Sequence, residues 1–319
     1  MNERERIAML ARLFGPGAAC GRGIAAGIGD DAALLDVDRG LEGGGTRLAW
    51  TIDEQVEGVH FCREFASFFD VGWRSFMAAM SDIAAMGAAP WCALSALVLP
   101  NNVSDADLED LARGQRAAAE ATGAALVGGN LSRGPALSIS TTILGGCARG
   151  VRRSGALVGD GLWLTGRVGL AAAGLRALQT GSARDGSLRD AVAAWRTPRA
   201  LVSCGLEMAS VAHAAIDVSD GLACDVGHLA DASGVRAVID EAALRSDEAL
   251  MVAARALGVD PIDLALHGGE DYALVVASPA PIVGFRAIGH VSDGRGVALL
   301  GPGGELRIEP GGYDHFEWR

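Results

Sequence analysis

Five short clusters of glycine and carboxylate are spread along the chain. They are GIGDD at 27–31, TIDEQVEGVHF at 51–61, SDIAAMGAAP at 81–90, IDVSDG at 216–221 and HGGEDY at 267–272. Each stands beside an apolar run, which predicts a turn that presents backbone groups and carboxylates together. The chain contains no lysine to neutralise this acid. Because Mg²⁺ prefers oxygen ligands and usually binds with substrate phosphates, the clusters indicate an enzyme that handles a nucleotide through several divalent ions.

The aspartates differ in how strongly they indicate a site. Asp82 interrupts a helix of apolar and small residues, where a carboxylate is costly unless it is paired or metal-bound. Asp217 and Asp220 end an apolar strand and could ligate metal while Ser219 contacts phosphate. The alternative for Ser219 and Asp220 is that they only cap the following helix. Asp31 of the GDD turn could likewise be an ordinary turn residue.

In the segment 51–61, Asp53 is the last residue of an expected strand and His60 follows seven positions later. Its imidazole could hydrogen-bond a phosphate or a substrate, although a lone histidine is more often structural. In HGGEDY two glycines permit close backbone approach before Glu270 and Asp271, as expected of a loop that receives a substrate. Each cluster could be a simple turn, but five in one chain favour a shared site.

Composition excludes several function classes. The net charge is −12 and the pI is near 4.9, and no basic stripe suits nucleic acid. Without lysine, a Walker A loop, a protein-kinase site and Schiff-base chemistry are all excluded. Phosphate charge must therefore be met by metal, arginine, backbone N–H groups and helix N-termini.

The cysteines and the N-terminus indicate a cytoplasmic protein. Six cysteines are spread out with no CxxC pair, which predicts buried free thiols in a reducing compartment. The start, MNERERIAMLARLFG, predicts an ordinary first helix rather than a signal peptide. No run of 18 apolar residues predicts a membrane span.

The periodicity of the chain predicts a mixed α/β protein of two domains, 1–148 and 149–319. Segment 146–160, rich in arginine and glycine, breaks the periodicity and marks the boundary. Ser104 and Asp107 predict a capping box at the start of helix 105–122. The remaining expected helices are 71–86, 168–179, 188–195, 198–212, 221–232 and 247–257. The expected strands are 46–53, 93–100, 124–127, 137–144, 162–165, 215–218, 273–277 and 297–300, with the glycine-rich GGNLSRG (128–134) as the link after 124–127.

With these motifs in this order, the chain resembles the thiamine-monophosphate kinase family, within the superfamily of aminoimidazole ribonucleotide synthetase-like ATP-binding proteins. The motifs run from GIGDD through TIDEQVEGVHF, SDIAAMGA, GGNLSRGP, RRSGA, IDVSDGLACDVGH and GGEDY to GYDHF at 312–316. The resemblance implies transfer of the γ-phosphoryl group of ATP onto thiamine monophosphate, giving thiamine diphosphate. It also implies an N-terminal α/β domain that forms a homodimer through its sheet, and a C-terminal α/β domain that completes the site.

The resemblance also assigns roles to residues. Asp31, Thr51 and Asp53 resemble magnesium ligands of the family, as do Asp82, Asn130, Asp217 and Asp220. Gly129, Asn130, Arg153 and Ser219 resemble contacts to ATP, and the fixed donor fork of Arg153 suits a phosphate. His60, Glu270 and Tyr313 resemble contacts to thiamine monophosphate. No residue is expected to act as acid or base, because direct in-line transfer between phosphates needs charge neutralisation and positioning.

Two positions depart from the family pattern. Asn130 stands where the family has aspartate, and Ile52 stands where it has threonine. Asn130 retains an amide oxygen but removes one negative charge from a metal site. The alternatives are therefore a nucleotide-binding paralogue with lost or altered kinase activity, or another ATP-dependent enzyme of the superfamily. ATP hydrolysis with and without thiamine monophosphate would separate the kinase from the paralogue.

Overall fold

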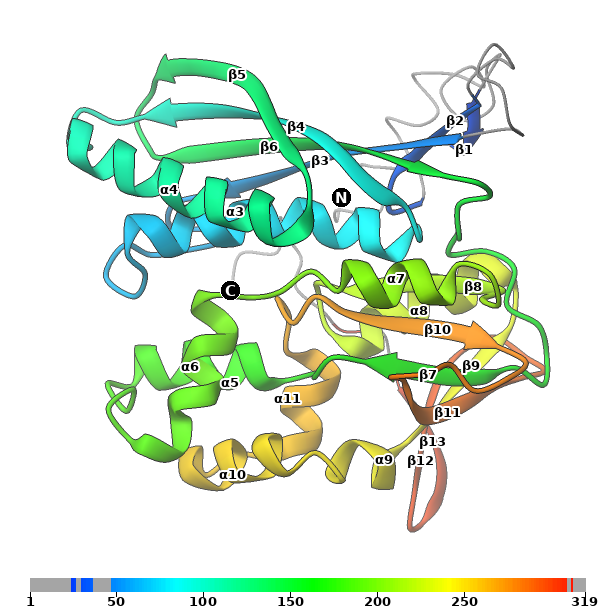
Figure 1. The fold of residues 1–319 in the computed structure, drawn as a ribbon. Coiled ribbons are helices and arrows are strands. Elements are labelled where there is room, and N and C mark those ends of the chain that lie inside the picture. The colour runs from blue at the N-terminus through cyan, green and yellow to red at the C-terminus, as the bar shows by residue number, and fades with distance from the viewer. Residues whose placement is uncertain (1–23, 27–29, 37–46, 309–310, 312–319) are drawn as a thin grey trace.

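The computed structural model describes residues 24–26, 30–36, 47–308 and 311. They form two α/β domains, one above the other in Figure 1, each built on a mixed sheet. The predicted fold class is confirmed. The expected first helix and the terminal GYDHF segment, with Tyr313, lie outside the described residues.

The first sheet has six strands in the order β1-β2-β3-β6-β4-β5. They are β1 (Ile24–Ala26), β2 (Ala33–Asp36), β3 (Arg47–Val56), β4 (Ala89–Leu99), β5 (Ala125–Arg133) and β6 (Ser138–Cys147). Along β3, Ala49 and Thr51 are buried while Trp50 and Ile52 are exposed, because alternate side chains of a strand point to opposite faces. One face of the sheet is therefore buried against the rest of the protein, and the other, which we call the open face, is exposed.

Two helices, α3 (Phe68–Ala85) and α4 (Asp105–Thr122), cover the packed face. Each begins with a complete capping box, Ser67 with Asp70 and Ser104 with Asp107. The capping box predicted at Ser104 is confirmed, and α4 has the bounds that the sequence indicates. It ends at Gly123 in the left-handed conformation, as helices often do.

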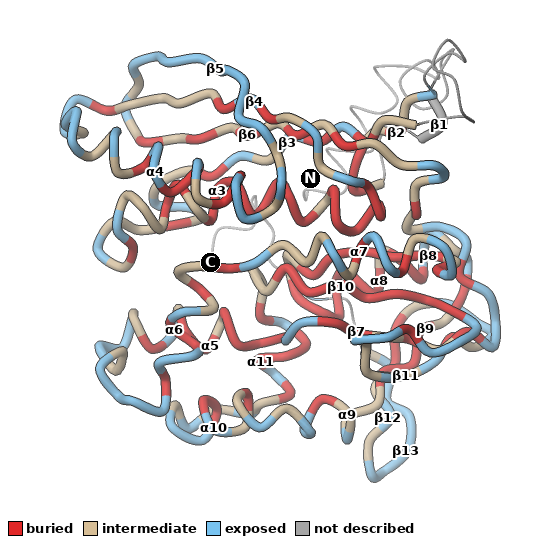
Figure 2. Tube along the Cα trace, in the orientation of Figure 1, coloured by how far each residue is buried: buried red, intermediate tan, exposed pale blue. Residues whose placement is uncertain are grey.

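The glycine-rich segment GGNLSRG was expected to be a link and is instead mostly strand, as part of β5. Gly129 has a packing reason to be glycine there, because a Cβ atom would lie 1.8 Å from the carbonyl oxygen of Ser95 on β4. Glycine thus permits close strand pairing rather than a turn. The β5 residues are exposed along their whole length (Figure 2).

The second sheet has seven strands in the order β13-β12-β9-β11-β7-β10-β8. They are β7 (Gly161–Thr165), β8 (Ala214–Val218), β9 (Arg236–Asp240), β10 (Ala273–Ser278), β11 (Arg286–Ser292), β12 (Gly296–Gly301) and β13 (Gly304–Ile308). Its helices are α5 (Leu170–Gln179), α6 (Arg189–Arg196), α7 (Val202–Met208), α8 (Leu222–Ser233), α9 (Glu241–Arg245), α10 (Glu248–Leu257) and α11 (Pro261–His267), with a 3₁₀ turn at Gly186–Leu188. The helix expected at 198–212 is shorter than predicted. In β8 and β10 all residues are buried, so these strands are covered on both faces.

Helix α3 joins the two domains, since it packs on the first sheet and also against α7, β8 and β10. Small residues make this contact possible. Ala84 and Ala85 lie in one apolar cluster with Met208, and a Cβ atom on Gly205 would lie 2.2 Å from the carbonyl oxygen of Ala84. The small residues of SDIAAMGA therefore serve domain packing, and they bring Asp82 to the boundary between the domains.

Among the described residues no helix is both long and apolar enough to cross a membrane. The five described cysteines are free thiols, as predicted. Burial was predicted for all of them, but only Cys224 is buried and the other four are partly exposed.

Candidate active site

Three of the predicted aspartates meet at the domain boundary. Asp31 lies just before β2, Asp82 lies on α3 and Asp217 lies on β8. One carboxylate oxygen of each lies within 4.8 Å of the others. Residues from distant parts of the sequence are thus gathered in one place, which we call the carboxylate cluster (Asp31, Asp82, Asp217).

Neighbouring side chains orient the carboxylate cluster. The Thr51 hydroxyl donates to Asp82 Oδ2 at 2.5 Å, and Arg153 Nε donates to Asp31 Oδ1 at 2.9 Å. Asp31 Oδ2 is buried and has no hydrogen-bond partner. A buried, unsatisfied oxygen on a carboxylate that is grouped with two further carboxylates is costly, and a cation would lower that cost.

Burial raises the pKa values of these groups. The pKa of Asp217 is raised to about 7, first by desolvation and then by the charge of Asp31. Desolvation, with the charges of Asp217 and Asp31, raises the pKa of Asp82 well above its usual range. The pKa of Asp31 is also raised by burial, against the opposing effect of Arg153. Protons and metal ions therefore compete for the same oxygens.

These pKa values predict how stability depends on pH and magnesium. A carboxylate whose folded pKa is raised binds more protons when folded, so metal-free stability should fall as pH rises from about 4 to about 7. The loss should be about 1.4 kcal/mol for each tenfold difference in proton affinity between the folded and unfolded states. Magnesium should restore stability more at pH 8 than at pH 5. The measurement is the Tm at both pH values with and without Mg²⁺. If Mg²⁺ raised the Tm equally at both pH values, the carboxylate cluster would not be the magnesium site.

Asp53 and Asp220 lie close to the carboxylate cluster. Asp53, half-buried on β3, has a pKa raised to about 7 by desolvation, with smaller contributions from the charges of Glu270 and Asp220. The charge of Asp53 in turn acts on Asp82. Acidic side chains from both domains therefore form one interacting group that extends from the carboxylate cluster to the HGGEDY loop.

The loop 219–221 is held by a buried carboxylate that the sequence analysis did not single out. Asp225 Oδ2 accepts hydrogen bonds from the backbone N–H groups of Asp220 and Gly221, each at 3.1 Å. Helix α8 has Gly221 as its N-cap and no side-chain cap. The N-cap position is therefore occupied by neither Ser219 nor Asp220. Both residues instead lie on a loop that Asp225 positions.

The HGGEDY loop touches this loop directly. Glu270 N–H donates to the Ser219 carbonyl oxygen at 2.7 Å, and a Cβ atom on Gly269 would lie 2.5 Å from that same oxygen. Glu270 and Tyr272 have positive φ angles, which are uncommon for residues other than glycine and concentrate at functional sites. At Gly269 the close approach is to the Ser219 carbonyl oxygen within the protein, so this glycine has a packing reason of its own.

Both oxygens of Glu270 are engaged within the protein. Arg74 of α3 donates to Oε1, and Trp195 Nε1 donates to Oε2 at 2.8 Å. The Arg74 guanidinium also lies 4.4 Å from the centre of the Trp195 ring and contacts the carbonyl oxygens of Trp195 and His60. Glu270, assigned as a substrate contact, is thus at the centre of a network that ties the two domains together.

The other assigned residues are in different places. His60 lies in the turn after β3, and its Nδ1 accepts from the Val56 N–H at 3.0 Å. Gly129 and Asn130 lie on β5, with β6 and β4 between them and β3. Asn130 shares the open face of the sheet with Ile52, away from the side on which Thr51 and Asp53 lie. Within one chain it does not join the carboxylate cluster.

Sequence reasoning missed Arg74, Trp195 and Asp225. Arg74 and Asp225 had a usable signal, because each is a single charge inside an otherwise apolar helix segment. Trp195 had none, since an aromatic residue on a helix usually indicates core packing.

Comparison with known proteins decides which family this arrangement represents. The model of the N-terminal domain of AIR synthase related proteins matches residues 29–147, and that of their C-terminal domain matches residues 158–300. Thiamine-monophosphate kinase of Aquifex aeolicus is 33% identical over 91% of this chain and 92% of its own length. The Salmonella typhimurium enzyme is 33% identical over 97% of this chain and 98% of its own. The chain belongs to the thiamine-monophosphate kinase family.

Solved structures agree with this assignment. A structure described as AaThiL complexed with AMPPCP and TMP has a TM-score of 0.89 and 31% identity, covering 99% of this chain and 97% of its own. Thiamine-monophosphate kinase of Stenotrophomonas maltophilia has a TM-score of 0.74 and 34% identity, covering 92% and 94%. The hydrogenase maturation protein HypE of E. coli, at 22% identity and a TM-score of 0.66, shares the fold alone.

Proposed function

We propose that this protein is a thiamine-monophosphate kinase, which transfers the γ-phosphoryl group of ATP to thiamine monophosphate to give thiamine diphosphate. The observation that carries the proposal is the carboxylate cluster at the domain boundary, in a chain similar over most of its length to enzymes of that name. A solved relative described as bound to AMPPCP and TMP supports the same pair of substrates.

The residues present fit magnesium. The cluster offers only oxygen donors, and Asp31 Oδ2 is buried without a partner. We propose Asp31, Asp82 and Asp217 as ligands, with Thr51, Asp53 and Asp220 beside them. Bound magnesium would neutralise the phosphate charge that develops during transfer.

The chain's own residues perform the remaining tasks. Thr51 and Arg153 fix the rotamers of Asp82 and Asp31, so that the ligand oxygens converge before substrate binds. Arg153, which is partly exposed, can also meet a phosphate with its planar donor fork. Asp225 holds the loop of Ser219 and Asp220, whose backbone lies against the substrate loop. His60 and Glu270 we assign to the thiamine-phosphate side, with Glu270 acting through Arg74 and Trp195. In-line transfer then depends on positioning and not on an acid or base.

The test is thiamine diphosphate formation by the purified protein with ATP, Mg²⁺ and thiamine monophosphate. We expect product that depends on all three, and no product when thiamine replaces thiamine monophosphate. ATP binding without product at any magnesium concentration would overturn the proposal and favour the nucleotide-binding paralogue.

Asn130 offers a second test, of the metal site. Within one chain Asn130 is away from the carboxylate cluster, so it can act as a ligand only where a second copy carries it to the metal site. If it does, Asn130→Asp should add a carboxylate donor and lower the Mg²⁺ concentration for half-maximal velocity by about threefold to tenfold, because ligand charge sets affinity for hard cations. Asn101→Asp, at an exposed turn, is the matched control and should change nothing. An unchanged magnesium requirement in Asn130→Asp would show that residue 130 is not a ligand.

We also propose that the protein is a homodimer that pairs through the open face of the first sheet. Among the described residues no helix covers this face, and Trp50, Ile52 and Leu94 expose 53%, 69% and 46% of their surface on it. Exposed apolar patches of this kind mark interaction sites. Asn130 and Ile52 both lie here, where a second copy could bring them close to its own site.

Leu94→Glu tests the dimer. A buried, unpaired carboxylate on this face should shift the protein from dimer to monomer in light scattering after size exclusion. Leu306→Glu is the control, because Leu306 is 69% exposed on β13 of the other domain. A dimer that survives Leu94→Glu would place the interface elsewhere.

Two further assignments complete the proposal. A cytoplasmic location is supported by the free thiols of the five described cysteines. A domain boundary between 148 and 149 is supported by the end of β6 at Cys147 and the start of β7 at Gly161, which belong to different sheets.

A further inference from the structure

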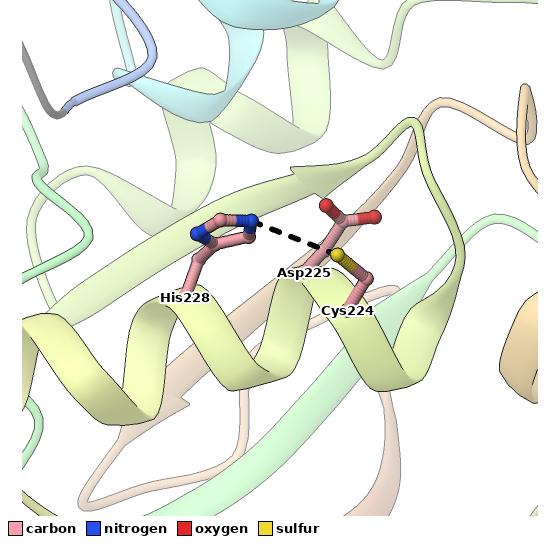
Figure 3. Close-up of side chains that lie close together, drawn as sticks. All are labelled: Cys224, Asp225 and His228. Atoms are coloured by element: carbon pink, nitrogen blue, oxygen red, sulfur yellow. Dashed lines mark hydrogen bonds between the residues drawn. The ribbon is translucent and has the colours of Figure 1, made fainter. Parts of the chain in front are cut away.

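A second group of metal-ligating side chains lies on α8, outside the carboxylate cluster. Cys224, Asp225 and His228 each place one ligand atom within 4.8 Å of the other two. Figure 3 shows Cys224 and His228 on the same side of the helix, one turn apart, with the Asp225 carboxylate beside the sulfur. We call these three residues the thiol cluster.

The geometry of the thiol cluster suits a tetrahedral ion. Cys224 Sγ and His228 Nε2 are 3.6 Å apart. Zinc bonds of about 2.3 Å to sulfur and about 2.05 Å to nitrogen, at the tetrahedral angle, place those two atoms about 3.6 Å apart. The spacing i, i+4 on one helix face holds both ligands with little rearrangement.

Asp225 supplies the third ligand and the link to the active site. Both of its backbone hydrogen bonds, from Asp220 and Gly221, fall on Oδ2, so Oδ1 is the oxygen that would ligate. The carboxylate is buried, and the charges of Asp220 and Asp217 act on it. A cation beside it would lower the cost of that buried charge.

The ligand set separates this site from the magnesium site. Thiolate and imidazole select borderline and soft divalent ions such as Zn²⁺, whereas magnesium takes carboxylate, carbonyl and water oxygens. We propose that Cys224, Asp225 and His228 bind one thiophilic divalent ion of the Zn²⁺ class, and that its occupancy acts on the active-site loop 219–221 through Asp225.

The experiment uses Co²⁺ as a spectroscopic probe of the full-length protein in excess Mg²⁺. We expect one equivalent of Co²⁺ to give a thiolate-to-cobalt charge-transfer band that Zn²⁺ abolishes by displacement. Cys224→Ser should remove the band and raise the Zn²⁺ Kd at least about 100-fold, since loss even of a group that only supports a ligand costs about 10–100-fold. Cys204→Ser is the control, because Cys204 lies on α7, where Thr165 donates to its sulfur, and its loss should leave the band intact.

A second readout tests the link to the loop. In wild type, Zn²⁺ at one equivalent and saturating Mg²⁺ should lower kinase velocity about fivefold or more, as expected for coupled sites. Cys224→Ser should keep its basal velocity and lose this inhibition.

Absence of the charge-transfer band, or a band that persists in Cys224→Ser, would rule out a metal site at the thiol cluster. Equal zinc inhibition in wild type and Cys224→Ser would overturn its coupling to the loop. The cobalt spectrum is independent of turnover, so the site can be judged even if thiamine diphosphate formation fails.

Discussion

Asp82→Asn should lower the rate of thiamine diphosphate formation by about 10³-fold or more, because charge stabilisation by metal contributes several kcal/mol to such transfers. The amide keeps the shape of the side chain and can still accept from the Thr51 hydroxyl. It removes one of the negative charges of the carboxylate cluster. The measurement is kcat for product formation at several magnesium concentrations.

The folded state should survive this change. Asp82 is repelled by Asp217 and Asp31, so the metal-free variant should have a Tm equal to or above that of wild type. The matched control is Asp105→Asn, an exposed aspartate in the first turn of α4, which should leave kcat unchanged. Near-normal turnover in Asp82→Asn would rule out Asp82 as a metal ligand.

Of the variants described, Arg74→Met should have the largest effect on stability. Its free energy of unfolding should fall by about 2–4 kcal/mol, which lowers the Tm by about 5–10 °C. Arg74 is 1% exposed and holds Glu270 and Trp195 of the other domain through a charge pair, a backbone carbonyl and ring contact. Glu270 is 24% exposed, so water offsets part of the loss. The measurement is thermal or denaturant unfolding.

The matched control for Arg74→Met is Arg113→Met. Arg113 pairs with Glu109 one turn away on α4, but both side chains are mostly exposed. Its removal should cost less than about 0.5 kcal/mol. Equal unfolding midpoints for the two variants would show that the Arg74 network does not hold the domains together.

The sequence by itself determined the local elements and the chemistry. Capping residues and periodicity specify α4 because they act between residues three or four positions apart. Asp82 could be singled out because a carboxylate inside an apolar helix is costly wherever the helix packs. The absence of lysine likewise excluded several phosphate sites without any structure.

The pairing of distant residues was decided only by the tertiary structure. The composition of GGNLSRG predicts a loop, yet most of it is strand. It pairs with β4, which lies so close that residue 129 must be glycine. Asn130 was assigned to the metal site by resemblance, but strand order places it on the open face. Arg74 and Glu270 are 196 positions apart, and no local pattern records their contact. Local preferences depend on neighbours along the chain, whereas a site at a domain boundary depends on how the sheets stack and which face each strand presents.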